Sequence, residues 1–146
     1  MKKTRVIPVL LLRNGWLVQS KQFCRYQNLG NPISAVRRLS EWAADELMYL
    51  DITRDGRYDM RRDDLGHPNR RNIFEIIEDV SQAAHMPVTV GGGIRTLRDI
   101  EKRLSLGADK VCINTKAIDE PRFVESAAKE FGSDRKSTRL NSSHRL

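Results

Sequence analysis

The chain has 146 residues, which is enough for one domain with a core of modest size. Charged residues make up 31% and hydrophobic residues 39% of it, a mixture typical of a globular protein and not of long disorder. No apolar run approaches the roughly 20 residues that span a bilayer. Two cysteines, Cys24 and Cys112, exclude a disulfide framework, so we expect a cytoplasmic protein with reduced thiols and no membrane partner.

The net charge of +7 is unevenly distributed. Residues 134–146 hold four basic residues against one aspartate, so they carry +3 and residues 1–133 carry +4. Only 6% of the residues are aromatic, so few side chains are available to stack on bases. We therefore expect no nucleic-acid partner.

The N-terminal apolar run covers residues 5–12. Pro8 interrupts the run and Arg13 ends it, which favours a buried strand over a signal peptide. A loop is expected over residues 13–30, and it either forms a lid over the functional face or packs its aromatic side chains on the domain. These aromatic residues are Trp16, Phe23 and Tyr26.

The remainder of the chain alternates apolar runs typical of strands with segments of helical period. Thr96 with Asp99 resembles a capping box, and Gly107 and Gly132 predict helix ends. The expected elements are a helix opened by Asn31 and Pro32, a strand at 47–50, a helix from Ile73, a strand at 88–90, a helix from Leu97, a strand at 110–113 and a helix from Pro121.

Four strand–helix units in series predict an α/β fold with a parallel sheet and right-handed crossovers. Both a doubly wound sheet and a (β/α)8 barrel begin in this way. A complete barrel needs about 250 residues, and this chain has roughly half of that.

The last residues, 134–146, read DRKSTRLNSSHRL and have no apolar period. One interpretation is a disordered basic tail. We prefer a foreign origin, because DRKSTRLNSSH matches the translation of a sequencing-library adapter. Residues 1–133 are then the N-terminal part of a longer protein.

Four segments, in order, resemble the cyclase subunit of imidazole glycerol phosphate synthase. They are residues 5–10 (RVIPVL), 45–53 (DELMYLDIT), 90–94 (VGGGI) and 107–115 (GADKVCINT). The resemblance implies a (β/α)8 TIM barrel built from two similar half-barrels. Residues 1–133 would be its N-terminal half, with four βα units.

The resemblance also implies a reaction. The cyclase of that family takes ammonia from a glutaminase partner, closes an imidazole ring and releases an aminoimidazole carboxamide ribotide, in histidine biosynthesis. Two aspartates act as its acid/base pair. The first corresponds to Leu11, whose side chain cannot transfer a proton, and the second would lie beyond residue 133.

The departure at Leu11 resembles a paralogous branch found with surface-polysaccharide genes, in which the cyclase-like protein delivers ammonia for amidination of a sugar. A second departure is an insertion at residues 54–72, rich in Arg and Asp. This insertion either reshapes the substrate site or is a solvated loop.

Polar residues and glycines after the strands predict a phosphate site. Glycines at 91–93 let a phosphate approach backbone N–H groups, and the helix start that follows favours an anion. By resemblance, Gly93, Asn114 and Thr115 would hold one phosphate of a phosphorylated small-molecule substrate. Asp51 either contacts substrate or is a structural carboxylate bonded to loop N–H groups, and Thr53 is read in the same two ways.

Charged residues at the strand starts form a second group. Arg5, Glu46 and Lys110 each begin a predicted strand and are either a ring of solvated charges or, by resemblance, a gate through which ammonia enters the barrel. Asp109 matches a position that faces the glutaminase. Histidines and cysteines share no metal-ligand spacing, so we expect no metal and no cofactor.

Three hypotheses follow for the function. The first is an ammonia-using enzyme subunit that pairs with a glutaminase as a heterodimer, either in the sugar-amidination branch or as a true histidine-biosynthesis cyclase. The second is a non-catalytic barrel that only conducts ammonia. The third is a half-barrel whose unpaired edges make it self-associate, and which is inactive alone.

Overall fold

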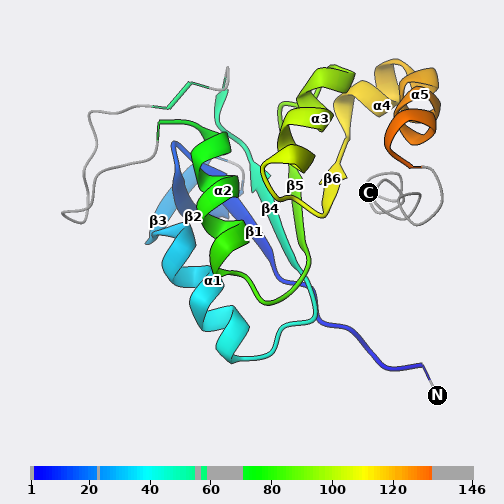
Figure 1. Cartoon of the computed structure of the whole chain (residues 1–146). Coiled ribbons are helices and arrows are strands. Elements are labelled where there is room, and N and C mark those ends of the chain that lie inside the picture. The colour runs from blue at the N-terminus through cyan, green and yellow to red at the C-terminus, as the bar shows by residue number, and fades with distance from the viewer. Residues whose placement is uncertain (1, 23, 55–56, 59–70, 133–146) are drawn as a thin grey trace.

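The computed structural model describes residues 2–22, 24–54, 57–58 and 71–132 (Figure 1). Within them lies a six-stranded sheet in the order β3-β2-β1-β4-β5-β6. The strands are β1 (Val9–Arg13), β2 (Trp16–Lys21), β3 (Arg25–Gly30), β4 (Leu47–Asp51), β5 (Val88–Gly91) and β6 (Lys110–Cys112). The helices are α1 (Pro32–Glu41), α2 (Ile73–Ala83), α3 (Leu97–Ser105), α4 (Thr115–Asp119) and α5 (Pro121–Phe131).

Strands β1, β4, β5 and β6 are parallel neighbours. Their register places Leu11 opposite Leu50, Leu50 opposite Gly91, and Gly91 opposite Cys112. Because directly paired residues point to the same side of a sheet, these four side-chain positions share one face. β4, β5 and β6 are each followed by a helix, which is the repeating unit that the sequence predicts, whereas β2 and β3 intervene between β1 and α1.

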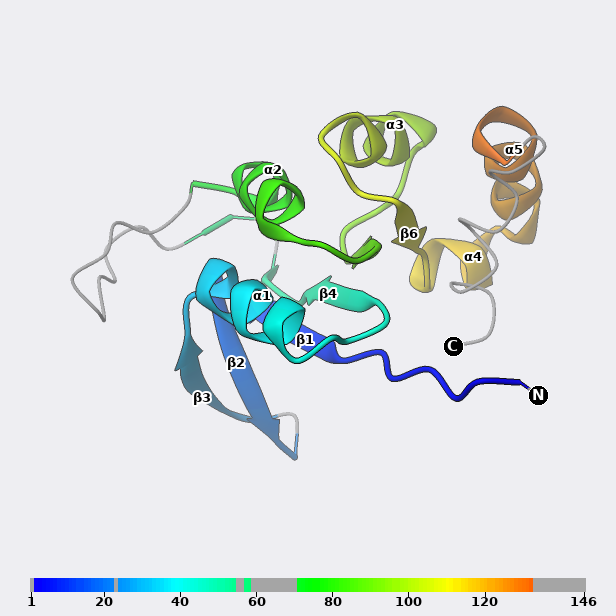
Figure 2. The ribbon, with the colours of Figure 1, turned by 60° about the horizontal axis from the view of Figure 1, so that its bottom comes forward.

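The opposite face of the sheet carries the core. Leu12, Tyr49 and Val90 point to it and are almost completely buried. Helices α1 and α2 pack there side by side, and Figure 2 shows both, with α3, on one side of the strands. Burying this layer supplies most of the stability, at about 25 cal/mol per Å² of apolar surface.

The helix starts follow their sequence signals. The Asn31 side chain accepts a hydrogen bond from Ile33 N at 2.7 Å, and Pro32 occupies the first turn of α1. Thr96 and Asp99 form the expected capping box at α3. None of the helices in the described ranges is long and apolar enough to cross a membrane.

The segment expected as a loop at residues 13–30 forms antiparallel strands, so the loop prediction was wrong. Strand β2 pairs antiparallel with β1, and β3 pairs antiparallel with β2. Asn14 and Gly15 have φ angles of 52° and 82°, the two positive values that a type I′ turn requires. Trp16 is buried, and Tyr26 lies under the guanidinium of Arg13 at 4.3 Å. Phe23 lies outside the described residues.

The first strand begins later than predicted, at Val9 instead of residue 5. Pro8 has no N–H to donate to a ladder, so regular pairing starts after it. Residues before it still follow β4, because Asp45 N donates to Val6 O at 3.2 Å and Met48 N donates to Pro8 O at 3.0 Å.

Two other predictions fall on residues that the structure does not describe. The predicted foreign tail at 134–146 and most of the insertion at 54–72 lie outside the described residues. A short helix, α4, follows β6 and was not predicted.

Candidate functional site

A pocket of about 610 Å³ lies at the carboxyl ends of β4, β5 and β6. Three segments line it, at residues 50–52, 92–95 and 112–116, together with Asp119. All four residues predicted to bind substrate or phosphate are among them: Asp51, Gly93, Asn114 and Thr115. Parallel strands bring their carboxyl ends to one edge, which is why residues far apart in sequence meet here.

The glycine turn after β5 is forced by contact with β4. A Cβ on Gly92 would lie 2.1 Å from the carbonyl oxygen of Asp51, and its φ is +101°. Gly93 has a φ of +68°. Only glycine combines this backbone conformation with so close an approach. In the described part of the chain, the N–H groups of Gly93 and Ile94 donate no hydrogen bond, so both remain for a ligand.

Part of the start of α3 is occupied by its own side chains. The N–H groups of Arg95 and Thr96 both donate to Asp99 Oδ2 at 3.0 Å. Burial raises the pKa of the Asp99 carboxyl, but these hydrogen bonds outweigh burial and hold the pKa below its ordinary value. The capping box therefore occupies the N–H groups of Arg95, Thr96 and Asp99, whereas the turn before it keeps the N–H groups of Gly93 and Ile94.

Asp51 organises the rim of the pocket. Its Oδ1 accepts hydrogen bonds from Thr53 N at 3.0 Å and Thr53 Oγ1 at 2.5 Å, and its Oδ2 accepts one from Tyr58 at 3.1 Å. Thr53 Oγ1 in turn accepts from Asn14 N at 2.9 Å. Asp51 thus lines the pocket and ties the ends of β1 and β4 to the insertion. Its contact with substrate stays a prediction.

Tyr58 connects the insertion to the pocket. Burial raises the pKa of its hydroxyl strongly, and the neighbouring Asp51 carboxylate raises it further. The hydroxyl therefore stays protonated and donates to Asp51. Through this hydrogen bond the insertion contacts a residue that lines the pocket.

Three cations near the pocket were not predicted. Arg95 and Lys116 line it, and buried Arg103 reaches the glycine turn from α3. Arg95 lies just after the glycine motif and Lys116 just after Asn114-Thr115. Their proximity to these motifs could have predicted both as pocket residues. Arg103 had none, because its partner Gly92 lies 11 residues away in sequence.

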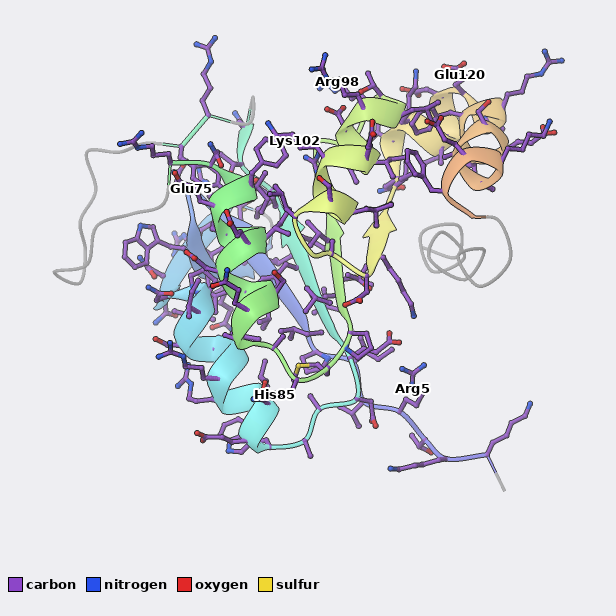
Figure 3. All side chains as sticks on the ribbon, viewed as in Figure 1. Arg5, Glu75, His85, Arg98, Lys102 and Glu120 are labelled. Carbon is purple, nitrogen blue, oxygen red and sulfur yellow. The ribbon has the colours of Figure 1, made fainter. Side chains whose placement is uncertain are left out.

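A second polar cluster lies at the amino ends of the same strands. Glu46 Oε1 accepts hydrogen bonds from Arg5 Nη2 at 2.5 Å and from Lys110 Nζ at 2.8 Å. Glu46 is only 6% exposed, whereas the Arg5 side chain is 52% exposed. Figure 3 shows Arg5 at the opposite end of the molecule from Arg98 and Glu120. The structure thus brings all three predicted gate residues together.

Opposing effects set the charge of Glu46. Burial favours the neutral acid and would raise the pKa of its carboxyl, but hydrogen bonds and charges from Lys110 and Arg5 lower that pKa below its ordinary value. Glu46 is therefore ionised at neutral pH. Nearby, exposed Asp109 accepts a hydrogen bond from Val88 N at 2.8 Å.

Leu11 lies on the same face of the sheet as the pocket residue Leu50, with which it is paired. The face that would hold the acid/base residue therefore presents aliphatic side chains at this point. In the described ranges, no group of three or more His, Cys, Asp or Glu residues is placed to hold a metal ion. Cys112 is buried, which raises the pKa of its thiol.

Comparison with known proteins identifies the family. The profile described as "Histidine biosynthesis protein" matches residues 5–143. A Campylobacter jejuni (strain ATCC 700819 / NCTC 11168) protein named as subunit hisF2 of imidazole glycerol phosphate synthase is 42% identical over 135 residues. The match covers 91% of this chain but 49% of that relative, so the chain spans about half its length.

The fold agrees with this result. Four parallel strands with helices on one side form part of a (β/α)8 barrel, as the sequence predicted. The predicted resemblance to cyclase-type subunits is likewise confirmed. The chain belongs to the histidine biosynthesis protein family, as a cyclase-like member of the type found in imidazole glycerol phosphate synthase.

Proposed function

We propose that residues 1–133 are the N-terminal half of a cyclase-like subunit that uses ammonia from a glutaminase partner. We further propose that it serves the branch in which the ammonia is used to amidate a surface sugar. One observation carries this proposal: the cluster of Arg5, Glu46 and Lys110 is intact, while Leu11 occupies the position of the family's acid/base aspartate.

The pocket supports a phosphorylated substrate. Unpaired N–H groups at Gly93 and Ile94 and the side chains of Asn114 and Thr115 offer hydrogen-bond donors, and Arg95 and Lys116 add positive charge. Donors of this kind at the end of parallel strands suit a phosphate ester. Asn114 does not use its side chain to cap α4, so the amide is available to the pocket.

The cluster at the other end supports ammonia passage. A buried carboxylate with two cationic partners lies at the amino end of the sheet. Because Glu46 has two partners, one cation can move away while the other still pairs with the carboxylate, so the cluster can open without leaving a buried charge unpaired. Asp109 lies exposed beside Lys110, and we propose this edge as the docking face for the glutaminase.

The alternative function is the ring-closing cyclase of histidine biosynthesis, which the description of the matching family favours. The two candidates differ in their need for an acid/base residue at position 11. Losing one member of such a pair costs about 10² to 10⁴ in rate. The complete protein should therefore show a cyclase rate at least about 10²-fold below that of a cyclase with both aspartates, and a rate typical of the family would establish the alternative.

Ammonia transfer is tested by replacing one member of the cluster. In the complete protein paired with its glutaminase, Lys110→Met should lower glutamine-supported product formation at least about tenfold. Product formation from added ammonium chloride should stay unchanged, because free ammonia reaches the site without the partner.

The matched control is Lys129→Met, which removes an exposed cation of α5 that pairs with Glu125 at 3.6 Å. This variant should retain full glutamine-supported activity. Equal activity of Lys110→Met and Lys129→Met with glutamine would refute the gate.

A further inference from the structure

Arg103 is an unusual residue for its position. It is 5% exposed, although arginine is among the residues most rarely buried. Its Nη1 donates to Asp99 O at 2.9 Å, and its Nη2 donates to Gly92 O at 3.2 Å. Among the described residues its Nε finds no hydrogen-bond partner. A buried charge with an unpaired donor costs stability, so packing alone does not explain it.

The guanidinium lies directly behind the glycine turn. Its Nη2 holds the Gly92 carbonyl and would lie 3.8 Å from a Cβ on Gly93. The centre of the guanidinium is 5.2 Å from the centroid of the Phe74 ring on α2. A ring face and a backbone carbonyl therefore fix the cation from two sides. Because the C=O and N–H groups of a trans peptide point in opposite directions, the Gly93 N–H points away from Arg103 when the Gly92 carbonyl points to it.

The charge of Arg103 acts on Asp51, one of the two aspartates that line the pocket. Burial lowers the pKa of the Arg103 guanidinium below its ordinary value, although the charges of Asp99 and Asp51 oppose this effect. Asp51 would repel an anion in the pocket, since like charges at short range oppose binding. A buried cation behind the turn offsets that repulsion without entering the pocket.

We propose that Arg103 is a positioning residue of the pocket, which holds the Gly92 carbonyl and offsets the charge of Asp51, so that the turn can bind an anionic group such as a phosphate ester. This inference rests on the proposed phosphate site and adds to it a residue from α3. It makes α3 a support of the site as well as part of the barrel wall.

The first test is the affinity for inorganic phosphate, measured by calorimetry on the 146-residue chain at fixed ionic strength. Arg103→Met should weaken binding about tenfold, because a charge-assisted contact is lost. The matched control is Lys102→Met, which removes a neighbouring cation whose Nζ lies 3.8 Å from the same Phe74 ring (Figure 3). The control should change the affinity by less than about twofold.

Charge offset is tested separately with Asp51. Asp51→Asn should tighten phosphate binding, and the double variant of Arg103→Met with Asp51→Asn should recover to within about threefold of the parent. A structural role of Arg103 alone would not produce this recovery. Equal affinities of Arg103→Met and Lys102→Met, or no recovery in the double variant, would overturn the proposal.

A second measurement does not depend on phosphate binding. Backbone order parameters of Gly92, Gly93 and Ile94 in the free protein should fall in Arg103→Met and stay unchanged in Lys102→Met. Unchanged order parameters in both variants would also overturn the proposal. If the parent chain binds no phosphate while the turn loosens in Arg103→Met, the phosphate site fails and the holding of Gly92 by Arg103 stands.

Discussion

The two ends of the parallel strands carry polar groups of different kinds. At the carboxyl ends, the pocket presents backbone N–H groups, an amide and a hydroxyl around a glycine turn. At the amino ends, Glu46 forms salt bridges with Arg5 and Lys110. Within the described residues, the first set keeps N–H groups without an acceptor, whereas in the second set the single carboxylate is paired with two cations.

This difference assigns different tasks to the two ends. Unfilled donors cost free energy in the absence of a ligand and are suited to binding one, whereas a closed ion cluster is suited to sealing an opening. The same strands connect the two ends. Leu50 in β4 pairs with Gly91 in β5, and the residues that follow each of them line the pocket. Variants that affect one end and spare the other can test the division.

The largest effect is expected at the glycine turn. Gly92→Ala places a Cβ 2.1 Å from the Asp51 carbonyl and at a φ of +101°, so we expect the free energy of unfolding to fall by about 3 kcal/mol or more. Gly30→Ala is the matched control, because Gly30 has a φ of +115° but no atom within 4 Å of its Cβ position. Urea unfolding of both should separate the clash from the backbone strain, and equal losses would contradict the account.

A smaller loss is expected at the amino-end cluster. Glu46→Ala removes a carboxylate shared by two cations and leaves the partly buried Lys110 unpaired, which should cost about 2 kcal/mol. Glu120→Ala breaks the exposed Lys116 pair at 2.7 Å and should cost about 0.5 kcal/mol or less. Denaturant midpoints of the two variants test this ranking.

The smallest effect concerns acid stability. The pKa of Glu46 lies below its ordinary value of 4.5 in the folded chain, so below that pH the unfolded state binds more protons. The stability from Glu46 is present above pH 4.5 and is lost as pH falls through the folded pKa. Glu46→Gln should therefore flatten the stability curve in this acid range.

Asp99 allows the same test of acid stability at the carboxyl end, because the pKa of its carboxyl is also lowered. Asp99→Asn should flatten the same acid range independently, because the two carboxylates lie in separate clusters. An unchanged acid limb in Glu46→Gln would show that the amino-end cluster contributes nothing to stability.

Much of the fold follows from local sequence signals. Asn31 with Pro32 and Thr96 with Asp99 specify the starts of α1 and α3 within a few residues, where no distant contact is needed. The hairpin was missed although Asn14-Gly15 is a strong turn signal, because the apolar alternation of β2 and β3 is weak.

Some residues of the candidate site could likewise be predicted from the sequence, and others could not. Gly93, Asn114 and Thr115 follow strands directly, so strand order alone predicts that they meet. Arg103 was not predictable, because its role depends on how α3 packs against β5 and Phe74. Helical periodicity indicates which face of a helix is buried, but not that a buried arginine bonds a distant carbonyl.

The central claim is that the carboxyl-end pocket binds an anion and the amino-end cluster does not. Titration of the isotopically labelled chain with inorganic phosphate, followed by amide chemical shifts, tests it residue by residue. We predict saturable shifts at Gly93, Ile94 and Thr115 and none at Glu46 or Lys110. Saturable shifts at the amino end, or none at the glycine turn, would contradict the account.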